Sequence, residues 1–475
     1  MTRTVEQLAA ESIALWQRGE DYFPPLVRRF TPAQQSHKEA LLYRFLASLE
    51  SELISAPRIR ADRARVHARI TAAFAEFARC ALELEDRHLA LLLDRGFPSV
   101  GTSLGRQARR FDPDVGTAEI LQACRNAWAA CGLQALFGLP MSVTPAIFAY
   151  SMLYPYSDNY LDDDAVPRER KLRFSAQFRR RLAGENLPAA NGREETIWRL
   201  VSLIESGYAR AEYPDVYASL LAIHRSQEES IRLLQRDCDS GPDTVLPVVF
   251  AKGGTSVLAD AYLAAGRLTD AEASFAFDWG VLLQLGDDLQ DVREDSGKGL
   301  RTVFSTAANH GQLDSLTNRT FHFALDVMTR MDALTAAPEA LKGLLRRSSI
   351  SLVVRAAGAL PELYSEAYIA ELETYSPFRF AFLKSRQEKL TRHFTYRTEF
   401  SPRRRGGRRG MSFLFGGERP PNKKPSSMSR HTLFAASSDE TQLYIYARRA
   451  KVYDPIAVSR SDHKKIPSAF PASLR

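Results

Sequence analysis

Hydrophobic residues recur every three or four positions through most of the first 395 residues. Residues 36–54 and 65–96 show this spacing plainly, and Gly and Pro punctuate the joins between such stretches. The spacing places apolar side chains on one face of an α-helix. No convincing alternation of apolar and polar residues predicts a strand, and no repeat of 20–50 residues is visible. We therefore predict an all-α protein built as a single large helical bundle.

An uncharged run covers residues 126–157, and its length makes it a candidate membrane span. A span needs about 20 continuous apolar residues. Gly138, Pro140, Pro145 and Pro155 interrupt this run, and several polar residues dilute it. We therefore expect two helices that are buried on all sides and separated near Gly138, and not a membrane helix.

The composition changes near the C-terminus, where residues 396–475 are rich in Arg, Gly, Pro and Ser. Residues 401–475 hold 16 Lys+Arg and 5 Asp+Glu, a net charge of +11, so the +8 of the whole chain leaves −3 for the first 400 residues. This composition is typical of disorder. We predict a helical domain over 1–395, with N-terminal helices in 1–115 and a helical core in 116–395, followed by a basic, largely disordered tail over 396–475.

Cysteines and the N-terminus bear on location. The chain has no C-x-x-C pair and no Cys near a His cluster, so we expect reduced core thiols at Cys80, Cys124, Cys131 and Cys238. The first residues lack the basic-then-apolar form of a signal peptide. These features predict a cytoplasmic protein, with at most a peripheral association with membranes.

A dense acid cluster ends the uncharged run. The segment YSDNYLDDDAVPRER, residues 156–170, holds four aspartates within seven positions. Asp158 and Asp162 are four residues apart, so on a helix they share one face.

A second acid cluster follows the same pattern about 130 residues later. An apolar stretch over 275–285 leads into the acidic residues Asp287, Asp288, Asp291, Glu294 and Asp295. Like charges on one helix face repel, and desolvation at the mouth of an apolar core adds to that cost. A divalent cation removes both costs, and carboxylates without His or Cys suit Mg²⁺, with Mn²⁺ as the alternative. Both clusters can also be read as solvated helix ends.

These two clusters resemble the aspartate-rich motifs of class I isoprenoid synthases, which are all-helical enzymes that condense or cyclise prenyl diphosphates. Asp158, Asn159 and Asp162 fall on the three acidic positions of the first D-D-x-x-D motif, with Asn159 as a departure from it. Asp287, Asp288 and Asp291 fall on the second motif. The resemblance covers roughly residues 120–390.

The branch of the superfamily stays open at this point. The stretch LQLGDDLQDVREDSGKG also resembles the squalene and phytoene synthase signature, which would use Asp291 and Asp295 together with Asp158 and Asp162. The G-K-x-x-R-P element of chain-elongating synthases has only poor counterparts, in LGRQARR and Arg125. Elongation, cyclisation and head-to-head condensation therefore remain alternatives.

The resemblance implies a prenyltransferase or terpene synthase that ionises an allylic prenyl diphosphate with Mg²⁺, and it is compatible with a homodimer. Its implied catalytic residues are Asp158, Asp162, Asp287 and Asp291. Its implied metal ligands are these four with Asn159, Asp288 and Asp295. Candidate diphosphate contacts are Arg168, Arg170, Lys252, Lys298 and Arg301. Candidate walls of an apolar pocket are Tyr154, Tyr160, Phe250 and Trp279.

Two rival functions remain. One is a non-catalytic helical partner subunit with the same fold. The other is a protein that binds an anionic polymer or a membrane through its basic tail, although a solubilising tail is the simpler expectation. His224 lies in the polar stretch 223–235. We expect it to be a surface histidine without a catalytic role.

Overall fold

The computed structural model describes residues 3–54, 60–94, 96–161, 163, 165–232, 242–309 and 311–386. Within these ranges every regular element is a helix, which confirms the all-α prediction. Among the described residues, no helix combines the length and apolarity that a membrane crossing requires. The predicted tail, 396–475, lies outside the described residues.

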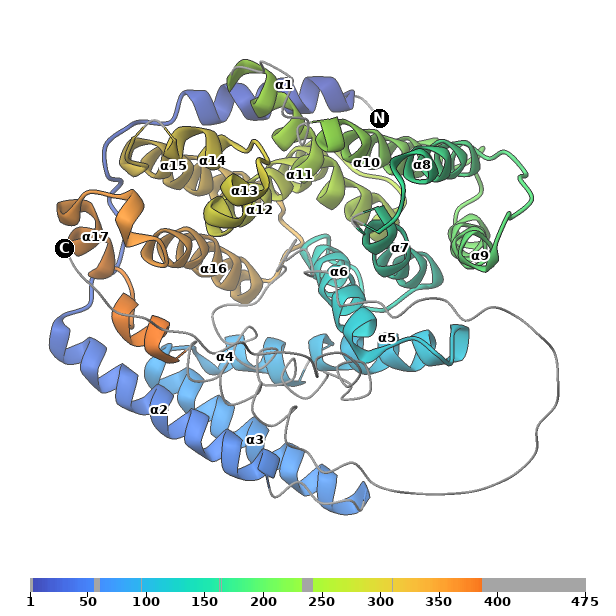
Figure 1. The fold of residues 1–475 in the computed structure, drawn as a ribbon. Coiled ribbons are helices and arrows are strands. Elements are labelled where there is room, and N and C mark those ends of the chain that lie inside the picture. The colour runs from blue at the N-terminus through green and yellow to red at the C-terminus, as the bar shows by residue number, and fades with distance from the viewer. Residues whose placement is uncertain are drawn as a thin grey trace, which may run out of the picture.

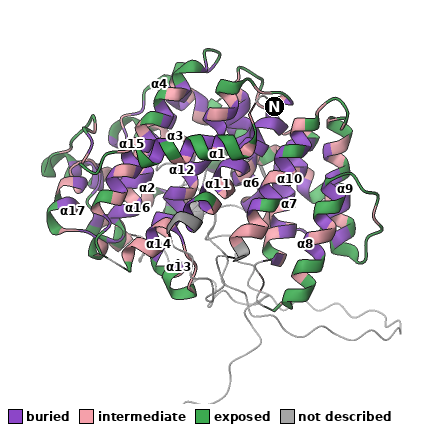
Figure 2. Cartoon of the chain, turned by 90° about the horizontal axis from the view of Figure 1, so that it is seen from above, coloured by how far each residue is buried: buried purple, intermediate pink, exposed green. Residues whose placement is uncertain are grey.

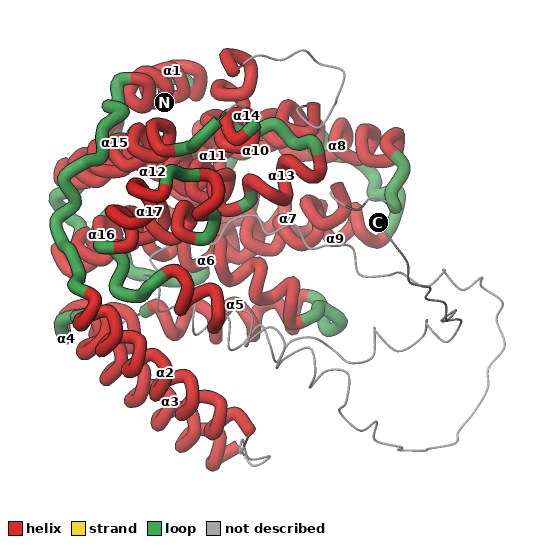
Figure 3. Tube along the Cα trace, turned by 60° about the vertical axis from the view of Figure 1, so that its left-hand side comes forward, coloured by secondary structure: helices red, strands yellow, loops and turns green. Residues whose placement is uncertain are grey.

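Five helices precede the predicted core. The long helices α2 and α3 pair with each other and project from the rest of the molecule as a hairpin (Figure 3). The helix α1 instead packs against α11, α12 and α15, so the N-terminus belongs to the main bundle. The bounds are α1 (Val5–Gln17), α2 (Pro32–Ile54), α3 (Arg60–Ala81), α4 (Asp86–Leu89), a π-helical segment (Ala90–Asp94) and α5 (Phe97–Phe111).

The remaining helices form a bundle in which α11 and α12 are central (Figure 1). They are α6 (Thr117–Leu136), α7 (Pro145–Leu161), α8 (Arg168–Leu182), α9 (Gly192–Gly207), α10 (Pro214–Arg232), α11 (Pro242–Ala265), α12 (Asp270–Gln290), α13 (Val292–Lys298), α14 (Val303–Ala308), α15 (Asp314–Arg330), α16 (Glu339–Gly358) and α17 (Glu366–Glu373). Short 3₁₀ turns follow α15 and α16.

The uncharged run folds as predicted, as two helices. The first is α6, and Gly138 follows it with a φ of +73°, a left-handed conformation that favours glycine. Thr144 then accepts a hydrogen bond from the amide of Ile147 and so caps α7. Both helices are buried along most of their length.

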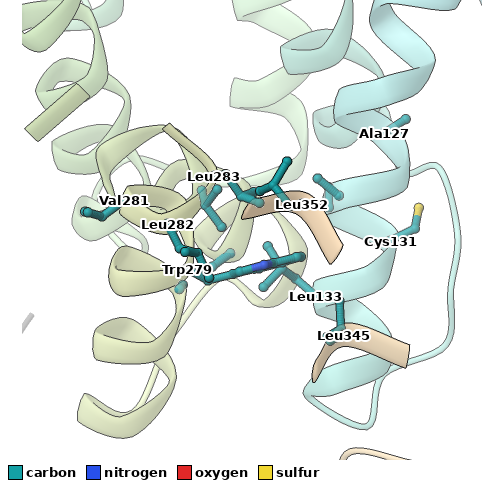
Figure 4. Close-up of a cluster of buried hydrophobic side chains, with 14 of the residues drawn as sticks. Ala127, Cys131, Leu133, Trp279, Val281, Leu282, Leu283, Leu345 and Leu352 are labelled. Carbon is teal, nitrogen blue, oxygen red and sulfur yellow. The ribbon is translucent and has the colours of Figure 1, made fainter. Parts of the chain in front are cut away.

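The hydrophobic core lies where α12 meets α6 and α16. Trp279 of α12 is 1% exposed and lies among leucines of these helices, including Leu133, Leu345 and Leu352 (Figure 4). Trp279 also stacks on Phe275, one turn earlier in α12. The indole therefore serves the core in this structure.

The backbones of α11 and α12 are in close contact at Gly253 and Gly280. A Cβ built at Gly253 would lie 2.7 Å from the carbonyl oxygen of Gly280, and one at Gly280 would come closer still to the carbonyl oxygen of Gly253. Only glycine on both helices permits this approach. The contact fixes the register of the two helices that carry Lys252 and the second acid cluster.

Candidate functional site

The second acid cluster straddles the junction of α12 and α13. Thr269 and Glu272 form a capping box at the start of α12, and the helix runs unbroken to Gln290. Asp291 stands at the junction, and Gly299, with a φ of +71°, ends α13. The sequence thus builds one apolar helix whose last turns deliver carboxylates to an end of the bundle.

Asp288 is the most constrained carboxylate of this cluster. It is 4% exposed, and its Oδ1 accepts a hydrogen bond of 2.7 Å from Nε2 of Gln284. Its Oδ2 is buried without a hydrogen-bond partner among the described residues. Burial raises the pKa of Asp288 to about 7, against the lowering effects of Gln284 and Lys252.

Asp295 has a similar environment. It is 4% exposed, and burial, together with the charges of Asp288 and Asp291, raises its pKa to about 7. Lys252 opposes this rise. Asp287 is buried as well, at 5% exposure. The structure therefore brings the predicted carboxylates of the second cluster together in a partly desolvated place, with the ammonium group of Lys252 within electrostatic range of Asp288 and Asp295.

The position of Lys252 follows from the glycine contact. Lys252 directly precedes Gly253, which touches Gly280 across the helix interface. Gln284, which holds Asp288, lies one turn beyond Gly280 on α12. Close backbone packing at this level thus places Lys252 within electrostatic range of Asp288 and Asp295.

The first cluster is arranged differently. Nε2 of Gln227, on α10, lies 3.3 and 3.4 Å from the two carboxylate oxygens of Asp158, and the hydroxyl of Ser157 lies 3.2 Å from Oδ1. Asp158 is half-buried near the end of α7. Asp162, predicted as its partner, lies outside the described residues.

Asn159 makes a reciprocal amide pair. Its Nδ2 donates to Oε1 of Gln122, and Nε2 of Gln122 donates to its Oδ1, each over 3.1 Å. An aspartate at this position would lose one of the two bonds because a carboxylate has no donor. The asparagine that departs from the family motif therefore joins α7 to α6.

Both clusters lie at one end of the bundle. The first cluster leads into α8 and the second continues into α13, and these two helices lie along the same edge of the molecule (Figure 2). The helix α11 lies between, since Lys252 acts on Asp288 while its deeper residue Asp260 acts on Tyr150 of α7.

A buried polar network lies below this end and was not predicted from the sequence. Asp260 is 2% exposed and accepts a hydrogen bond of 2.9 Å from Nδ2 of Asn126, which also lies 3.2 Å from the hydroxyl of Ser151. Burial raises the pKa of Asp260 well above its usual range. The Tyr150 hydroxyl bonds to Ser256. A spacing of four between Lys252, Ser256 and Asp260 is the signal that would have revealed this face of α11.

The predicted diphosphate contacts are spread over the rim. Lys298 pairs with Glu294 over 2.6 Å, and Arg301 follows α13 as a half-buried residue. Arg168 and Arg170 are exposed in the first turn of α8. Lys252 interacts electrostatically with the buried carboxylates Asp288 and Asp295.

Three of the four predicted wall aromatics pack against other aromatic side chains. Phe250 is fully buried against Trp16 and Phe323, and Tyr160 packs edge-on against Phe174 beneath the guanidinium of Arg193. Trp279 belongs to the core described above. Tyr154 remains, half-buried one turn before Asp158 on the same face of α7.

Two smaller expectations were wrong. His224 is 2% exposed, not a surface residue, because its ring packs on Phe178 and its Nε2 lies 3.0 Å from the carbonyl oxygen of Ser175. Cys80 is exposed, whereas Cys124 and Cys131 are buried as expected.

The donor set of the second cluster fits a hard divalent cation, since it offers carboxylate oxygens and one buried oxygen that no other described residue satisfies. No group of three or more His, Cys, Asp or Glu side chains converges tightly enough to hold a metal within the part of the chain that the structure describes. Metal binding by these residues is therefore not shown.

Comparison with known proteins gives the chain no family. No family model matches its sequence. No curated protein matches it either, and no solved structure matches its fold. What is established is an all-helical protein whose described residues gather a set of buried carboxylates and a lysine at one end of the bundle.

Proposed function

We propose that this protein is a Mg²⁺-dependent enzyme that ionises an allylic prenyl diphosphate and condenses or cyclises the resulting cation. The observation that carries the proposal is the environment of Asp288, a buried carboxylate with an unsatisfied oxygen beside Lys252. Burial of a carboxylate with an unsatisfied oxygen lowers the stability of the fold. We therefore infer that the arrangement serves a function.

The residues divide into two roles. Asp287, Asp288, Asp291 and Asp295 would hold Mg²⁺, with Asp158 contributing from α7. When bound, the metal would neutralise the negative charge that develops on a leaving diphosphate. Lys252 would donate charge-assisted hydrogen bonds to diphosphate oxygens. Its place beside the carboxylates, set by the glycine contact, supports this assignment.

The rest of the bundle supports the same chemistry. The helices α6, α7, α11 and α12 bury nearly all of their apolar side chains, so the carboxylates border a dry interior. Exclusion of water would protect a carbocation from premature capture. Two polar pairs, Tyr150–Ser256 and Asn126–Asp260, also lie within this interior.

The test is release of inorganic diphosphate. Purified protein is offered geranyl, farnesyl and geranylgeranyl diphosphate, with and without isopentenyl diphosphate, in Mg²⁺ and in EDTA. Mass spectrometry of the organic extract identifies the product and hence the branch of the superfamily. We expect Mg²⁺-dependent release that falls at least about 100-fold in Asp158→Asn and in Asp288→Asn.

A matched control separates a local from a general effect. Glu195→Gln also removes one carboxylate, but from an exposed position on α9. It should release diphosphate at the wild-type rate. If no substrate yields diphosphate in Mg²⁺, the enzymatic proposal fails and the non-catalytic helical subunit becomes the better account.

A further inference from the structure

A strongly charged surface borders the first acid cluster. The helix α8 begins at Arg168, and its first two turns carry Arg168, Arg170, Lys171 and Arg173 against one acid, Glu169. We propose that this segment docks on an anionic membrane surface and turns the acid-cluster end of the bundle toward the bilayer. The docking does not depend on the proposed enzymatic activity.

The two halves of α8 differ in how their cations are used. In the last turn, Arg179 pairs with Glu228 over 2.9 Å, Arg180 with Glu185 over 2.6 Å and Arg181 with Glu205 over 2.6 Å. In the first two turns, none of the four cations has an ion pair with another residue that the structure describes. Glutamates outside α8 neutralise the cations of its last turn, whereas in the first two turns Arg168, Arg170 and Arg173 are exposed and Lys171 is half-buried.

Apolar groups lie among the basic residues of the first two turns. Leu172 is 56% exposed, and Ala165 and Pro167, just before the helix, are exposed as well. One exposed leucine on a surface is ordinary. Here Leu172 is flanked in the sequence by Lys171 and Arg173. The apolar stems of such basic side chains can lie along a membrane interface while their charges reach lipid headgroups.

Charge complementarity favours a lipid surface over another polyanion. The cytoplasmic leaflet attracts juxtamembrane basic segments strongly enough that several Lys and Arg act together. Nucleic acid would use the same cations, but it would gain nothing from Leu172, whereas a bilayer interface buries that side chain. The combination of cations and an exposed leucine therefore selects a membrane as the partner.

The orientation has a functional meaning. Since α8 and α13 share one edge of the molecule, a membrane bound to α8 would lie next to the acid clusters (Figure 2). If the proposed function holds, a water-insoluble product would leave the site beside the phase in which it dissolves. This last point alone depends on the proposed function.

The first experiment is vesicle co-sedimentation with the full-length protein. Vesicles contain phosphatidylcholine alone or with 30% phosphatidylserine. Lys171→Glu/Arg173→Glu reverses two cations of the patch and leaves the predicted diphosphate contacts Arg168 and Arg170 in place. We expect binding to phosphatidylserine vesicles to weaken at least about tenfold.

Two matched variants carry the same change of charge elsewhere. Arg18→Glu/Arg44→Glu alters exposed residues of other helices, and Arg403→Glu/Arg404→Glu alters the basic tail. The first should bind like the wild type. The second measures how much of the affinity comes from the tail, which is itself strongly basic.

The second experiment gives a local signal that tail binding cannot produce. In Leu172→Trp, we expect phosphatidylserine vesicles to shift tryptophan emission to the blue and brominated lipids to quench it. Leu139→Trp places the same probe at a residue 39% exposed in the loop between α6 and α7, at the other end of α7 from the acid cluster. Its emission should not respond.

The outcomes decide the matter. Weaker vesicle binding in the Lys171/Arg173 variant together with quenching at position 172 supports the proposal. Vesicle binding that quenches neither probe means that the tail holds the membrane and overturns it. Lys171→Glu/Arg173→Glu is also tested for binding to poly(U). Loss of poly(U) binding with unchanged vesicle binding overturns the proposal and assigns the patch to nucleic acid.

Discussion

At the scale of single residues, burial of carboxyl groups in the second acid cluster raises their pKa and costs stability when they ionise. Burial raises the pKa of Asp288 and of Asp295 to about 7, from an ordinary value of 3.8. An acid with a higher pKa in the folded state stabilises the fold most when it is protonated. Its contribution is complete below pH 4 and is lost as the pH rises toward and through 7.

This loss of stability with rising pH gives a prediction for Asp288→Asn. Without Mg²⁺, the variant should match the wild type near pH 4 and exceed it at pH 8 by up to about 4 kcal/mol, since an amide never has to ionise. Urea unfolding in EDTA at pH 4 and pH 8 measures the difference. Equal dependence on pH in the two proteins would show that Asp288 ionises freely.

Mg²⁺ should reverse the order of stability of the wild type and Asp288→Asn. At pH 8, Mg²⁺ is expected to raise the midpoint of thermal unfolding of the wild type because a cation offsets the repulsion between buried carboxylates. Asp288→Asn should show little or no rise. Ca²⁺ at the same concentration serves as a control for a general ionic effect, since its larger size and longer bonds suit a different cage.

The amide pair of Asn159 and Gln122 gives a second prediction at this scale. Two hydrogen bonds of 3.1 Å join α7 to α6. The double-mutant cycle of Asn159→Ala and Gln122→Ala should show a coupling of about 1 kcal/mol in the free energy of unfolding. Additive losses would mean that the pair contributes nothing in solution.

At the scale of elements, the contact of α11 with α12 decides where Lys252 lies. Gly253→Ala places a methyl group 2.7 Å from the carbonyl oxygen of Gly280, so the helices must separate. Overpacking of this kind costs about 1–3 kcal/mol, which exceeds the gain of about 1 kcal/mol in helix propensity. We expect a net loss of stability together with reduced diphosphate release.

Gly105→Ala is the matched control within α5. The nearest atom to its added Cβ is 3.7 Å away, an ordinary contact. Thermal unfolding should show unchanged or higher stability, because alanine favours the helix. If both substitutions had the same effect, close packing at Gly253 would not be the cause.

The helices themselves were predictable because their signals are local. The three- and four-residue spacing of apolar positions marks each amphipathic helix, and Gly138, Pro140 and Pro145 mark the break between α6 and α7, whereas Pro155 lies inside α7. His224 was placed on the surface because its own stretch is polar. Its burial comes from Phe178 and Ser175 of α8, about fifty residues away, which no local pattern reveals.

The site was predictable to a similar extent. The spacing of the second cluster identified the carboxylates that the structure brings together, and Lys252 was named through the resemblance to class I isoprenoid synthases. The network at Asp260 was missed because its partner Asn126 lies 134 positions away in the sequence. The wall positions Phe250 and Trp279 were chosen by residue type, but burial depends on neighbours from other helices.

At the scale of the whole molecule, the described residues hold all of the proposed site except Asp162. The chain from residue 400 onward should therefore be dispensable for chemistry. We expect a protein ending at residue 399 to release diphosphate within about twofold of the full-length rate, a difference of less than 0.5 kcal/mol in activation free energy. Loss of activity with an unchanged far-ultraviolet spectrum would give the tail a part in the site.

The central claim is that the two acid clusters bind Mg²⁺ and diphosphate together. Isothermal titration calorimetry of the full-length protein with inorganic diphosphate tests this directly, in Mg²⁺ and in EDTA. We predict binding in Mg²⁺ that disappears in EDTA and falls at least about tenfold in Asp158→Asn and in Asp291→Asn. Equal binding in EDTA, or no binding in Mg²⁺, would contradict the account.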